Sequence, residues 1–405
     1  MNARFYPVKL IGTTEASSYT ETALRYFALA SVAEGRTRIY LKNETEDVYS
    51  LKDAFGDLGV GFYRDRNVYT VDPASEVAYQ DYVRTDVKSS ITALRFMLPI
   101  LLAKTDRCEI KGAGRLTQKD VTKGFGVLKG VKFDSNTLPF LASGRLVAGD
   151  YVVEGDANSQ LTSSLLMALP LLNGNSTLSF SEKPKKKLLS MLEQTALIMQ
   201  DFGVKVEFSD CCYKIIGGQK YLAPEKEIVI EGDYSTAGYF MALELLGSEV
   251  KVKNLDKNSL QSDKIILSYL SAIKEGNAEI ELKPKTNFVF LLTALASVKD
   301  RTTVFTNVKF KEKDVEIFNT FSSMLVRMGA SITLSGERLT VVGTDSLSGG
   351  VMLDTLGDSR VAKTLIVLST ALENPVTILS VEASMIEQNT FLNEFIKLGG
   401  KVETI

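Results

Sequence analysis

The sequence predicts an α/β protein of two domains, each built from three similar units. A chain of 405 residues is longer than one hydrophobic core usually supports, which indicates two domains. A helix that ends at glycine and is followed by a short strand recurs along the whole chain. A Glu-Gly-Asp segment that joins a strand to a helix occurs twice. A repeating unit of several strands and two helices accounts for both patterns.

Six glycines mark the ends of the predicted units. Glycine adopts the left-handed conformation that follows many helices at little cost, so each site indicates a helix end. Most intervals are about 70 residues, which is longer than a solenoid repeat, and the fourth interval is shorter. The six sites are Gly59, Gly130, Gly203, Gly276, Gly329 and Gly399.

The two Glu-Gly-Asp segments lie at predicted strand–helix junctions. The first, 154–156, follows a predicted strand at 150–153, and Asn158 or Ser159 can cap the apolar helix after it. The second, 231–233, follows a predicted strand at 227–230. Two unrelated caps of common composition are the alternative to an internal repeat. Helix starts of this kind suit anions, because free N–H groups and the positive dipole end point outward.

Polar helix starts recur elsewhere, and basic residues lie near several of them. If these ends converge, they form one cleft for anionic ligands. The alternative for each basic residue is an ordinary solvated surface charge. The further starts are Thr20, Ser89-Ser90, Asn287 and Asp358, and the basic residues are Arg25, Arg95, Arg115, Lys119, Lys313 and Arg360.

Composition excludes several classes of function. The net charge of −2 gives no bulk field that would recruit nucleic acid or a membrane. The absence of histidine excludes histidine acid–base catalysis, Ser/His triads and most catalytic zinc sites. Cys108, Cys211 and Cys212 are odd in number and lack metal-ligand spacing, which favours a reduced cytoplasmic protein. No cofactor and no metal are predicted.

Two further segments bear on location. The start of the sequence has no signal-peptide core. The longest apolar run, 288–298, is too short to span a bilayer and predicts a buried helix.

The segment from Glu231 to Phe240 and five further segments resemble motifs of the EPSP synthase (3-phosphoshikimate 1-carboxyvinyltransferase) family of enolpyruvyl transferases. Glu231-Gly-Asp-Tyr-Ser-Thr-Ala-Gly-Tyr-Phe240 is similar to the family's Glu-Gly-Asp-Ala-Ser-Ser-Ala-Ser-Tyr-Phe, the most specific match. Further segments resemble family motifs in the right order over nearly the whole chain. They are Thr92-Ala-Leu-Arg95, Gly112-Ala-Gly-Arg-Leu-Thr-Gln-Lys119, Glu154-Gly-Asp-Ala-Asn-Ser-Gln160, Lys257-Asn-Ser-Leu-Gln-Ser-Asp263 and Gly357-Asp-Ser-Arg360.

The resemblance implies a two-domain inside-out α/β barrel, with helices inside and sheets outside. Each domain has three repeated units, and the chain crosses twice between the domains. One domain is expected at 19–232 and the other at 1–18 and 233–405. The stretch from Asp263 to Asn287 is shorter than the family's, so part of the fourth unit is expected to be trimmed.

The resemblance also implies a reaction. The family transfers the enolpyruvyl group of phosphoenolpyruvate to the 5-hydroxyl of shikimate 3-phosphate in the shikimate pathway, which leads to the aromatic amino acids. Both substrates are multiply anionic, so a cation cluster and proton-transferring groups are needed. A cytoplasmic monomer without nucleic-acid or membrane partners is expected.

The family's site residues carry over to ten positions. Arg25, Asn158, Ser159 and Gln160 are expected to hold shikimate 3-phosphate. Lys119 and Arg360 are expected to bind phosphoenolpyruvate, and Arg95 to support the site. Lys313, Asp314 and Asn287 stand at the catalytic positions, with Lys311-Glu312 as an alternative for Lys313-Asp314.

Several positions depart from the family pattern. Lys119 replaces an arginine, which keeps the charge but loses the bidentate fork. Asn287 replaces the aspartate expected to accept the hydroxyl proton, and losing a general base typically costs roughly 10²–10⁴ in rate. Glu21, Asp314 and Glu316 are candidate substitutes for that base. The other departures are Thr20-Glu21 for Lys-Ser, Asn158 for Ser, Ile317 for Arg, Ser359 for His and Asn389 for Lys.

These departures leave three hypotheses open. The first is an active but divergent carboxyvinyltransferase. The second is a catalytically degenerate homologue that binds an anionic ligand or a protein partner. The third is a transferase with a different acceptor. The UDP-sugar branch is disfavoured by the 231–240 segment, and the RNA-cyclase branch by the lack of histidine.

Overall fold

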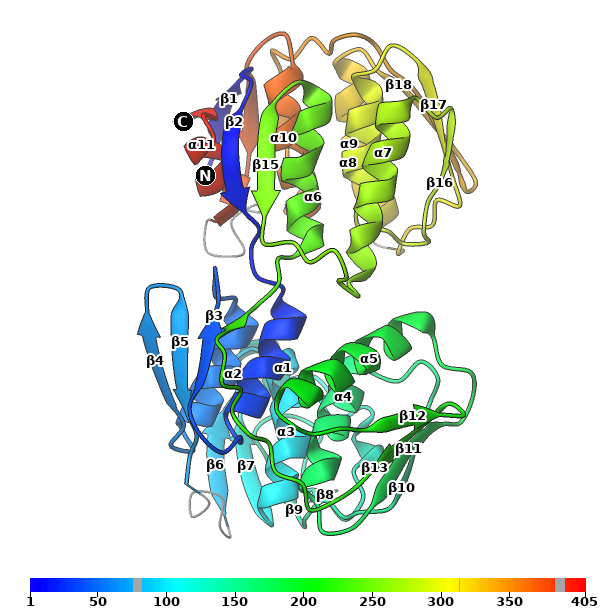
Figure 1. Cartoon of the computed structure of the whole chain (residues 1–405). Coiled ribbons are helices and arrows are strands. Elements are labelled where there is room, and N and C mark those ends of the chain that lie inside the picture. Colours follow the sequence, from blue (N-terminus) through cyan, green and yellow to red (C-terminus); the bar gives the residue numbers. More distant parts are fainter. Residues whose placement is uncertain (76–81, 313, 383–389) are drawn as a thin grey trace. The chain divides into compact units, whose positions relative to one another are not determined.

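The computed structural model describes residues 1–75, 82–312, 314–382 and 390–405 (Figure 1). The chain divides into two compact units. The N-terminal unit contains Ser18–Glu231, and the C-terminal unit contains Met1–Ser17 and Gly232–Ile405. The chain therefore passes between the units twice, after Ser17 and after Glu231.

Eleven α-helices occur in the described part of the chain. The N-terminal unit contains α1 (Thr20–Ala30), α2 (Glu46–Gly56), α3 (Ile91–Lys104), α4 (Ser159–Ala168) and α5 (Lys186–Asp201). The C-terminal unit contains α6 (Tyr234–Ala242), α7 (Ile266–Glu275), α8 (Val289–Ser297), α9 (Asp314–Arg327), α10 (Ser359–Leu368) and α11 (Thr390–Lys397).

Five sheets share one pattern, in which a parallel pair of strands is extended by two antiparallel strands. In the N-terminal unit, the strand order of the first sheet is β14 (Ile228–Val229), β3 (Thr37–Tyr40), β5 (Val68–Asp72), β4 (Gly61–Asp65). The order of the second is β6 (Val83–Asp86), β7 (Arg107–Lys111), β9 (Phe140–Ser143), β8 (Lys132–Phe133). The order of the third is β10 (Asp150–Val153), β11 (Ser176–Phe180), β13 (Cys212–Ile215), β12 (Glu207–Ser209). In the C-terminal unit they are β16 (Glu279–Glu281), β17 (Thr302–Thr306), β19 (Arg338–Val342), β18 (Ser331–Ser335); and β20 (Met352–Asp354), β21 (Val376–Leu379), β1 (Ala3–Tyr6), β22 (Lys401–Thr404).

The sixth sheet departs from this pattern. It consists of β2 (Ile11–Glu15) and β15 (Glu249–Lys253), paired in parallel. Among the described residues no antiparallel strands extend it. β4 and β5 follow Gly59, and β12 and β13 follow Gly203, whereas β16 comes directly after Gly276 in the described chain, which accounts for the short interval between Gly276 and Gly329.

Two strands are exchanged between the units at the chain crossovers. β2 directly precedes α1 in sequence, yet it pairs with β15 of the C-terminal unit, with Ile11 opposite Glu249. β14 precedes α6, yet it pairs with β3 of the N-terminal unit, with Ile228 opposite Ile39. Each unit therefore completes one sheet with a strand that adjoins a helix of the other unit.

Each unit has its own hydrophobic core, formed where helices pack inside the ring of sheets. Figure 1 shows the helices of each unit between strands that lie toward its periphery. Every residue of α8 is buried, as is the run from Leu161 to Ala168 in α4. A helix that is apolar on all sides is expected at such a position. The predicted buried helix at 288–298 is thus confirmed, and no described helix is long and apolar enough to cross a membrane.

The glycines predicted to end helices all have positive φ angles. Five of the six follow α-helices. Gly130 instead follows the 3₁₀ turn Phe125–Val127, because the second unit has 3₁₀ turns where the others have a second helix. The prediction of a helix end is therefore right at five sites, and at Gly130 the preceding element is shorter than predicted.

The two Glu-Gly-Asp segments correspond through their glycines. A Cβ atom on Gly155 would lie 2.7 Å from the carbonyl oxygen of Lys183, and one on Gly232 would lie 2.5 Å from that of Asn254. Both glycines let the chain pass close to a neighbouring backbone. The caps differ, however. Asn158 caps α4, two residues beyond the first segment, whereas Asp233 of the second segment itself caps α6.

The other predicted helix starts fall close to the observed ones. Ser90 and Asp358 cap α3 and α10 with their side chains. The helix predicted from Asn287 begins two residues later, at Val289, after Phe288 as N-cap. Thr20 is the first residue of α1 rather than its cap, and Tyr19, at the N-cap position, makes no side-chain capping bond.

Candidate functional site

The predicted site residues fall into two groups, one in each unit. In the N-terminal unit, a series of hydrogen bonds links side chains of helices α1, α3 and α4. The Gln160 amide donates to the Glu21 carboxylate (Nε2···Oε1 2.9 Å), and its carbonyl accepts from Arg95 (Nη1···Oε1 3.3 Å). Gln160 therefore connects an anionic and a cationic side chain from two other helices. The structure thus brings together Arg95 and Gln160, two of the predicted site residues, with Glu21 beside them.

Arg25 is fully buried beneath this surface, with an exposed fraction of 0%. Its guanidinium donates to Thr195 Oγ1 (2.8 Å), to Ser163 Oγ (2.9 Å) and to both the carbonyl and the carboxylate of Glu21 (2.6 and 3.1 Å). The guanidinium also lies 5.0 Å from the centre of the Phe96 ring. Burial lowers the pKa of Arg25, and the nearby Glu21 carboxylate opposes that shift. Arg25 thus anchors Glu21 from below, and its predicted contact with substrate stays a prediction.

Asn158 and Ser159 lie at the start of α4. The Asn158 side chain accepts from the backbone N–H groups of Gln160 (3.1 Å) and Leu161 (3.0 Å), so it satisfies two of the free donors of this helix end. Its side-chain oxygen is therefore committed to the helix. Ser159, the first residue of the helix, is half-buried.

Lys119 and Arg95 are the more accessible cations of this group. Lys119 lies just after the 3₁₀ turn Gly114–Thr117 and is exposed. Arg95 is half-buried, and burial lowers its pKa. Both side chains can therefore be reached from solvent.

In the C-terminal unit, Arg360 is held by two carboxylates. Asp314 receives a bidentate pair of bonds (Nη1···Oδ2 and Nη2···Oδ1, both 3.0 Å). Asp358 accepts from the Nε and Nη2 atoms, the shortest at 2.6 Å, while it also caps α10. The other face of the guanidinium lies over the Phe290 ring, 4.9 Å from its centre. The cation predicted to bind phosphoenolpyruvate is thus already surrounded by two negative charges and a ring.

The pKa values of this cluster follow from that geometry. The hydrogen bonds from Arg360 lower the pKa of Asp314. Burial alone would raise the pKa of Asp358, but the bonds and charge of Arg360 bring it below its ordinary value. Burial likewise works against the charge on Arg360, yet the two carboxylates raise its pKa overall. All three groups are therefore charged at neutral pH, and Asp314 is a weak proton acceptor.

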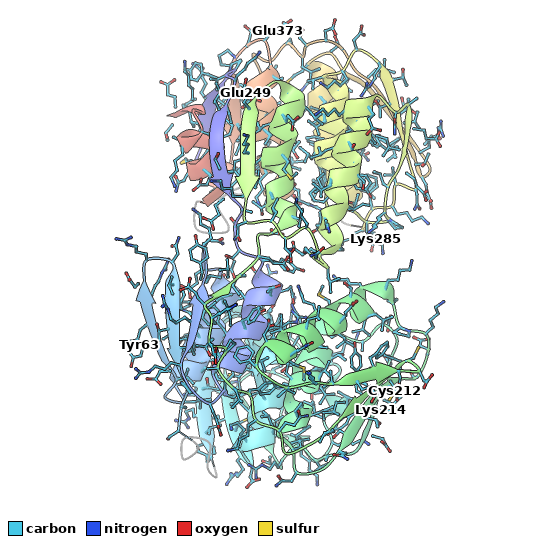
Figure 2. All side chains as sticks on the ribbon, viewed as in Figure 1. Tyr63, Cys212, Lys214, Glu249, Lys285 and Glu373 are labelled. Carbon is cyan, nitrogen blue, oxygen red and sulfur yellow. The ribbon has the colours of Figure 1, made fainter. Side chains whose placement is uncertain are left out.

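The remaining catalytic positions are less well connected. Asn287 is half-buried just before the start of α8, and Lys285, two residues earlier, is exposed (Figure 2). Lys313 and Asn389 lie outside the described residues. Lys311 and Glu312, the alternative pair, are both exposed, as is Glu316 on α9, whereas Asp314 is 5% exposed. Burial thus favours Asp314 over Glu312 as the carboxylate that belongs with Arg360.

Two partnerships escaped the sequence reasoning. The sequence identifies Glu21 as a departure from the family pattern but does not predict its bonds to Arg25 and Gln160. The (i, i+4) spacing of Glu21 and Arg25 on one helix was the available signal. Asp358 was recognised only as a helix start, although an N-cap aspartate two residues before an arginine is well placed to hold its side chain.

The comparisons with known proteins cover the whole chain. The sequence profile of EPSP synthase (3-phosphoshikimate 1-carboxyvinyltransferase) matches residues 7–395. The chain belongs to the EPSP synthase family. A Clostridium kluyveri protein named 3-phosphoshikimate 1-carboxyvinyltransferase is 29% identical over 419 residues, which cover 98% of this chain and 97% of that protein. A Brachyspira hyodysenteriae protein of the same name is 28% identical over 428 residues, which cover 99% and 100%.

Solved structures of this family share the fold. The EPSP synthase from Acinetobacter baumannii has a TM-score of 0.81 at 17% identity, with both chains covered completely. The enolpyruvyl transferase NikO from Streptomyces tendae has a TM-score of 0.72 at 14% identity, with 99% of this chain and 98% of NikO covered. The two-domain inside-out α/β architecture is thereby confirmed. Family membership supports enolpyruvyl transfer as the general chemistry of this protein.

Proposed function

We propose that the protein transfers the enolpyruvyl group of phosphoenolpyruvate to the 5-hydroxyl of shikimate 3-phosphate. The observation that carries the proposal is the family match over residues 7–395, together with cations at the polar helix starts where the resemblance expects them. In the reaction, a bond forms between the 5-oxygen and carbon 2 of phosphoenolpyruvate. The bond from that carbon to the phosphate oxygen breaks, and phosphate leaves.

The residues of the N-terminal unit suit the acceptor. Arg95 and Lys119 offer positive charge at the surface of the group, and Ser159 offers a hydroxyl at the start of α4. Gln160 is held by Glu21 and Arg95, so its side chain is positioned before any ligand arrives. A preorganised group loses less freedom on binding than a mobile one.

The proton steps rest on fewer candidates. The amide of Asn287 cannot accept a proton as a carboxylate does. Asp314 is unsuited because Arg360 lowers its pKa, which weakens it as a base. Glu21, whose side chain is 26% exposed and bonded to Gln160, is the better placed carboxylate of the N-terminal group. We assign Glu21 as the substitute base for the 5-hydroxyl.

A second function is favoured by one observation. Arg25 and Arg360, which the resemblance assigns to anionic substrates, are both neutralised by carboxylates of the chain itself. A homologue that binds a less anionic acceptor, or that binds a ligand without turnover, fits that feature. NikO shows that an enolpyruvyl transferase can share this fold without the EPSP synthase name.

Phosphate release from the purified full chain, given shikimate 3-phosphate and phosphoenolpyruvate, tests the first function. Calorimetric titration of shikimate 3-phosphate runs alongside. Turnover supports the proposal, and binding without turnover supports a degenerate homologue. If the protein neither binds shikimate 3-phosphate nor releases phosphate, both shikimate-based functions are contradicted. A transferase with another acceptor then remains.

Asn287→Asp sharpens the test. If the base position at Asn287 is vacant and Glu21 does not replace it, the aspartate raises turnover by about 10²-fold or more. Asn277→Asp, the same change at an exposed position after α7, is the matched control and should change nothing. An equal rate for wild type, Asn287→Asp and Asn277→Asp would show that Asn287 does not occupy the base position.

A further inference from the structure

The two-stranded sheet leaves one edge of β15 open. In the five four-stranded sheets, the strand equivalent to β15 pairs with a parallel strand on one side and an antiparallel strand on the other. β15 pairs with β2 alone among the described strands. Figure 1 shows β15 between strand β2 and helix α6. The internal repeat thus identifies a strand position that the described residues leave vacant.

The backbone groups at this edge can be assigned from the ladder. Glu249 donates its N–H to the carbonyl of Leu10 (2.8 Å), and the Lys253 carbonyl accepts from Ala16 (3.0 Å). In a strand, alternate residues direct their N–H and C=O groups to opposite sides. Val250 and Val252 therefore direct theirs away from β2, and they bond to no other described residue. Two donors and two acceptors are free to pair with a new strand.

The side chains show the same vacancy. Val250 and Val252 face the core of the unit but are only half-buried. The residues at comparable inward positions of the other five sheets are all 0% exposed. They are Ile39, Ile110, Leu178, Phe305 and Ile378. The valines of β15 thus lack the covering that an added strand supplies elsewhere in the molecule.

The charges on β15 select the occupant. Glu249, Lys251 and Lys253 alternate with the valines and are exposed, and Glu249 is labelled in Figure 2. Lysines on an edge strand usually oppose pairing with another chain. In an antiparallel pair of two β15 strands centred on Val250, however, Glu249 of each copy lies opposite Lys251 of the other. The register centred on Lys251 would pair each Glu249 with Lys253 but would place the two Lys251 side chains opposite each other, which is unfavourable.

We propose that two copies of this chain associate through β15, antiparallel and centred on Val250. The contact continues the C-terminal sheet across a two-fold axis and pairs the free N–H and C=O groups of the two Val250 residues with each other. Val252 then lies opposite Ser248, whose carbonyl can accept its N–H but whose own N–H already donates to Leu243. Such an interface is isologous, because the same surface serves both copies. It replaces the monomer that the family resemblance implies, and it depends on the missing strands rather than on the catalytic groups.

Sedimentation velocity of the full chain over about 1–300 µM tests the association, since a small interface gives a weak dimer. The expected species at high concentration has twice the chain mass of 44.5 kDa. A single 44.5 kDa species at every concentration would overturn the proposal.

Charge exchange tests the register. Lys251→Glu places carboxylates opposite each other and should weaken dimerisation about tenfold or more, because two like-charged pairs replace two attractive ones. The double variant Glu249→Lys/Lys251→Glu restores both pairs and should restore the dimer. Lys401→Glu, the same change on the edge strand β22, is the control and should have no effect. Failure of the double variant to recover, or equal weakening by Lys401→Glu, overturns the proposed register.

A backbone variant tests the strand pairing itself. Val250→Pro removes an N–H that points away from β2, so the existing ladder keeps its bonds. It should abolish the dimer while circular dichroism stays that of wild type. A dimer that survives both Val250→Pro and Lys251→Glu would use another surface and would refute the inference. If Val250→Pro unfolds the protein, the charge exchange decides alone.

Discussion

Replacing Glu21 by glutamine should strengthen anion binding at the N-terminal group. The carboxylate lies 3.1 Å from the Arg25 guanidinium and 2.9 Å from the Gln160 amide, so it occupies donors that an anionic ligand would compete for. Glutamine has the same shape and keeps an acceptor oxygen for both partners. The change therefore removes one negative charge with little loss of packing.

The magnitude follows from Coulomb's law. A unit charge about 6 Å from a bound monoanion is worth about 2–3 kcal/mol at an effective dielectric constant of ~20. Removing it should therefore tighten binding by about 30- to 150-fold. Arg25 is 0% exposed, so salt screens its part of the interaction less than it would at the surface.

Calorimetric titration of shikimate 3-phosphate into wild type and Glu21→Gln measures this change. Glu34→Gln is the matched control, because Glu34 pairs with exposed Lys220 in the same unit and the change in net charge is identical. The control should alter affinity by less than about threefold. Affinity for Glu21→Gln within threefold of wild type would refute the idea that Glu21 competes with a ligand anion. If Glu21 is also the substitute base, turnover should fall although binding improves.

Two further predictions concern stability, and both can be followed by urea unfolding. Asp314→Asn removes the charge that pairs with Arg360, whose side chain is 19% exposed, and should lower the free energy of unfolding by about 1–3 kcal/mol at pH 7. The pKa of Asp314 in the folded protein lies below its ordinary value, so the stabilisation by Asp314 is present above about pH 4 and is lost as the pH falls further. The difference in stability between Asp314→Asn and wild type should therefore shrink in acid. A difference that grows in acid would contradict this assignment. Gly232→Ala would place a Cβ atom 2.5 Å from both Ala16 and the Asn254 carbonyl and should cost about 1–3 kcal/mol, whereas Gly126→Ala, with open space around it, should be nearly neutral; equal stabilities would show that the backbone at Gly232 yields easily.

Local features of the fold were predictable from sequence. Helix caps such as Ser90 and Asp358, and glycines such as Gly203, act within a few residues, so their patterns are visible in the chain. The buried helix α8 was predictable for the same reason, since its apolar run is continuous. The recurrence of these signals gave the six units without any knowledge of long-range pairing.

Long-range partnerships were not predictable in this way. Arg360 and Asp314 are 46 residues apart, and only folding places their side chains together. The exchange of β2 and β14 between units leaves no local pattern, because a strand looks alike whichever sheet it joins. The burial of Arg25 was likewise hidden, since Thr195 and Ser163 reach it from α5 and α4. Family resemblance supplied positions in the sequence, but the replacement at Glu21 changed what surrounds them.

The placement of β1 and β2 at the start of the chain has a consequence for the order of events during protein synthesis. β1 pairs with β21 and β22, and β2 pairs with β15, so two strands that leave the ribosome before the N-terminal unit wait for strands that are made after it. The N-terminal unit is complete once Glu231 has emerged, whereas the C-terminal unit closes only when β22 is available. Domains generally fold as units during synthesis. The C-terminal unit is therefore expected to fold only after β22 has left the ribosome, with Phe5 and Leu10 exposed to solvent until then.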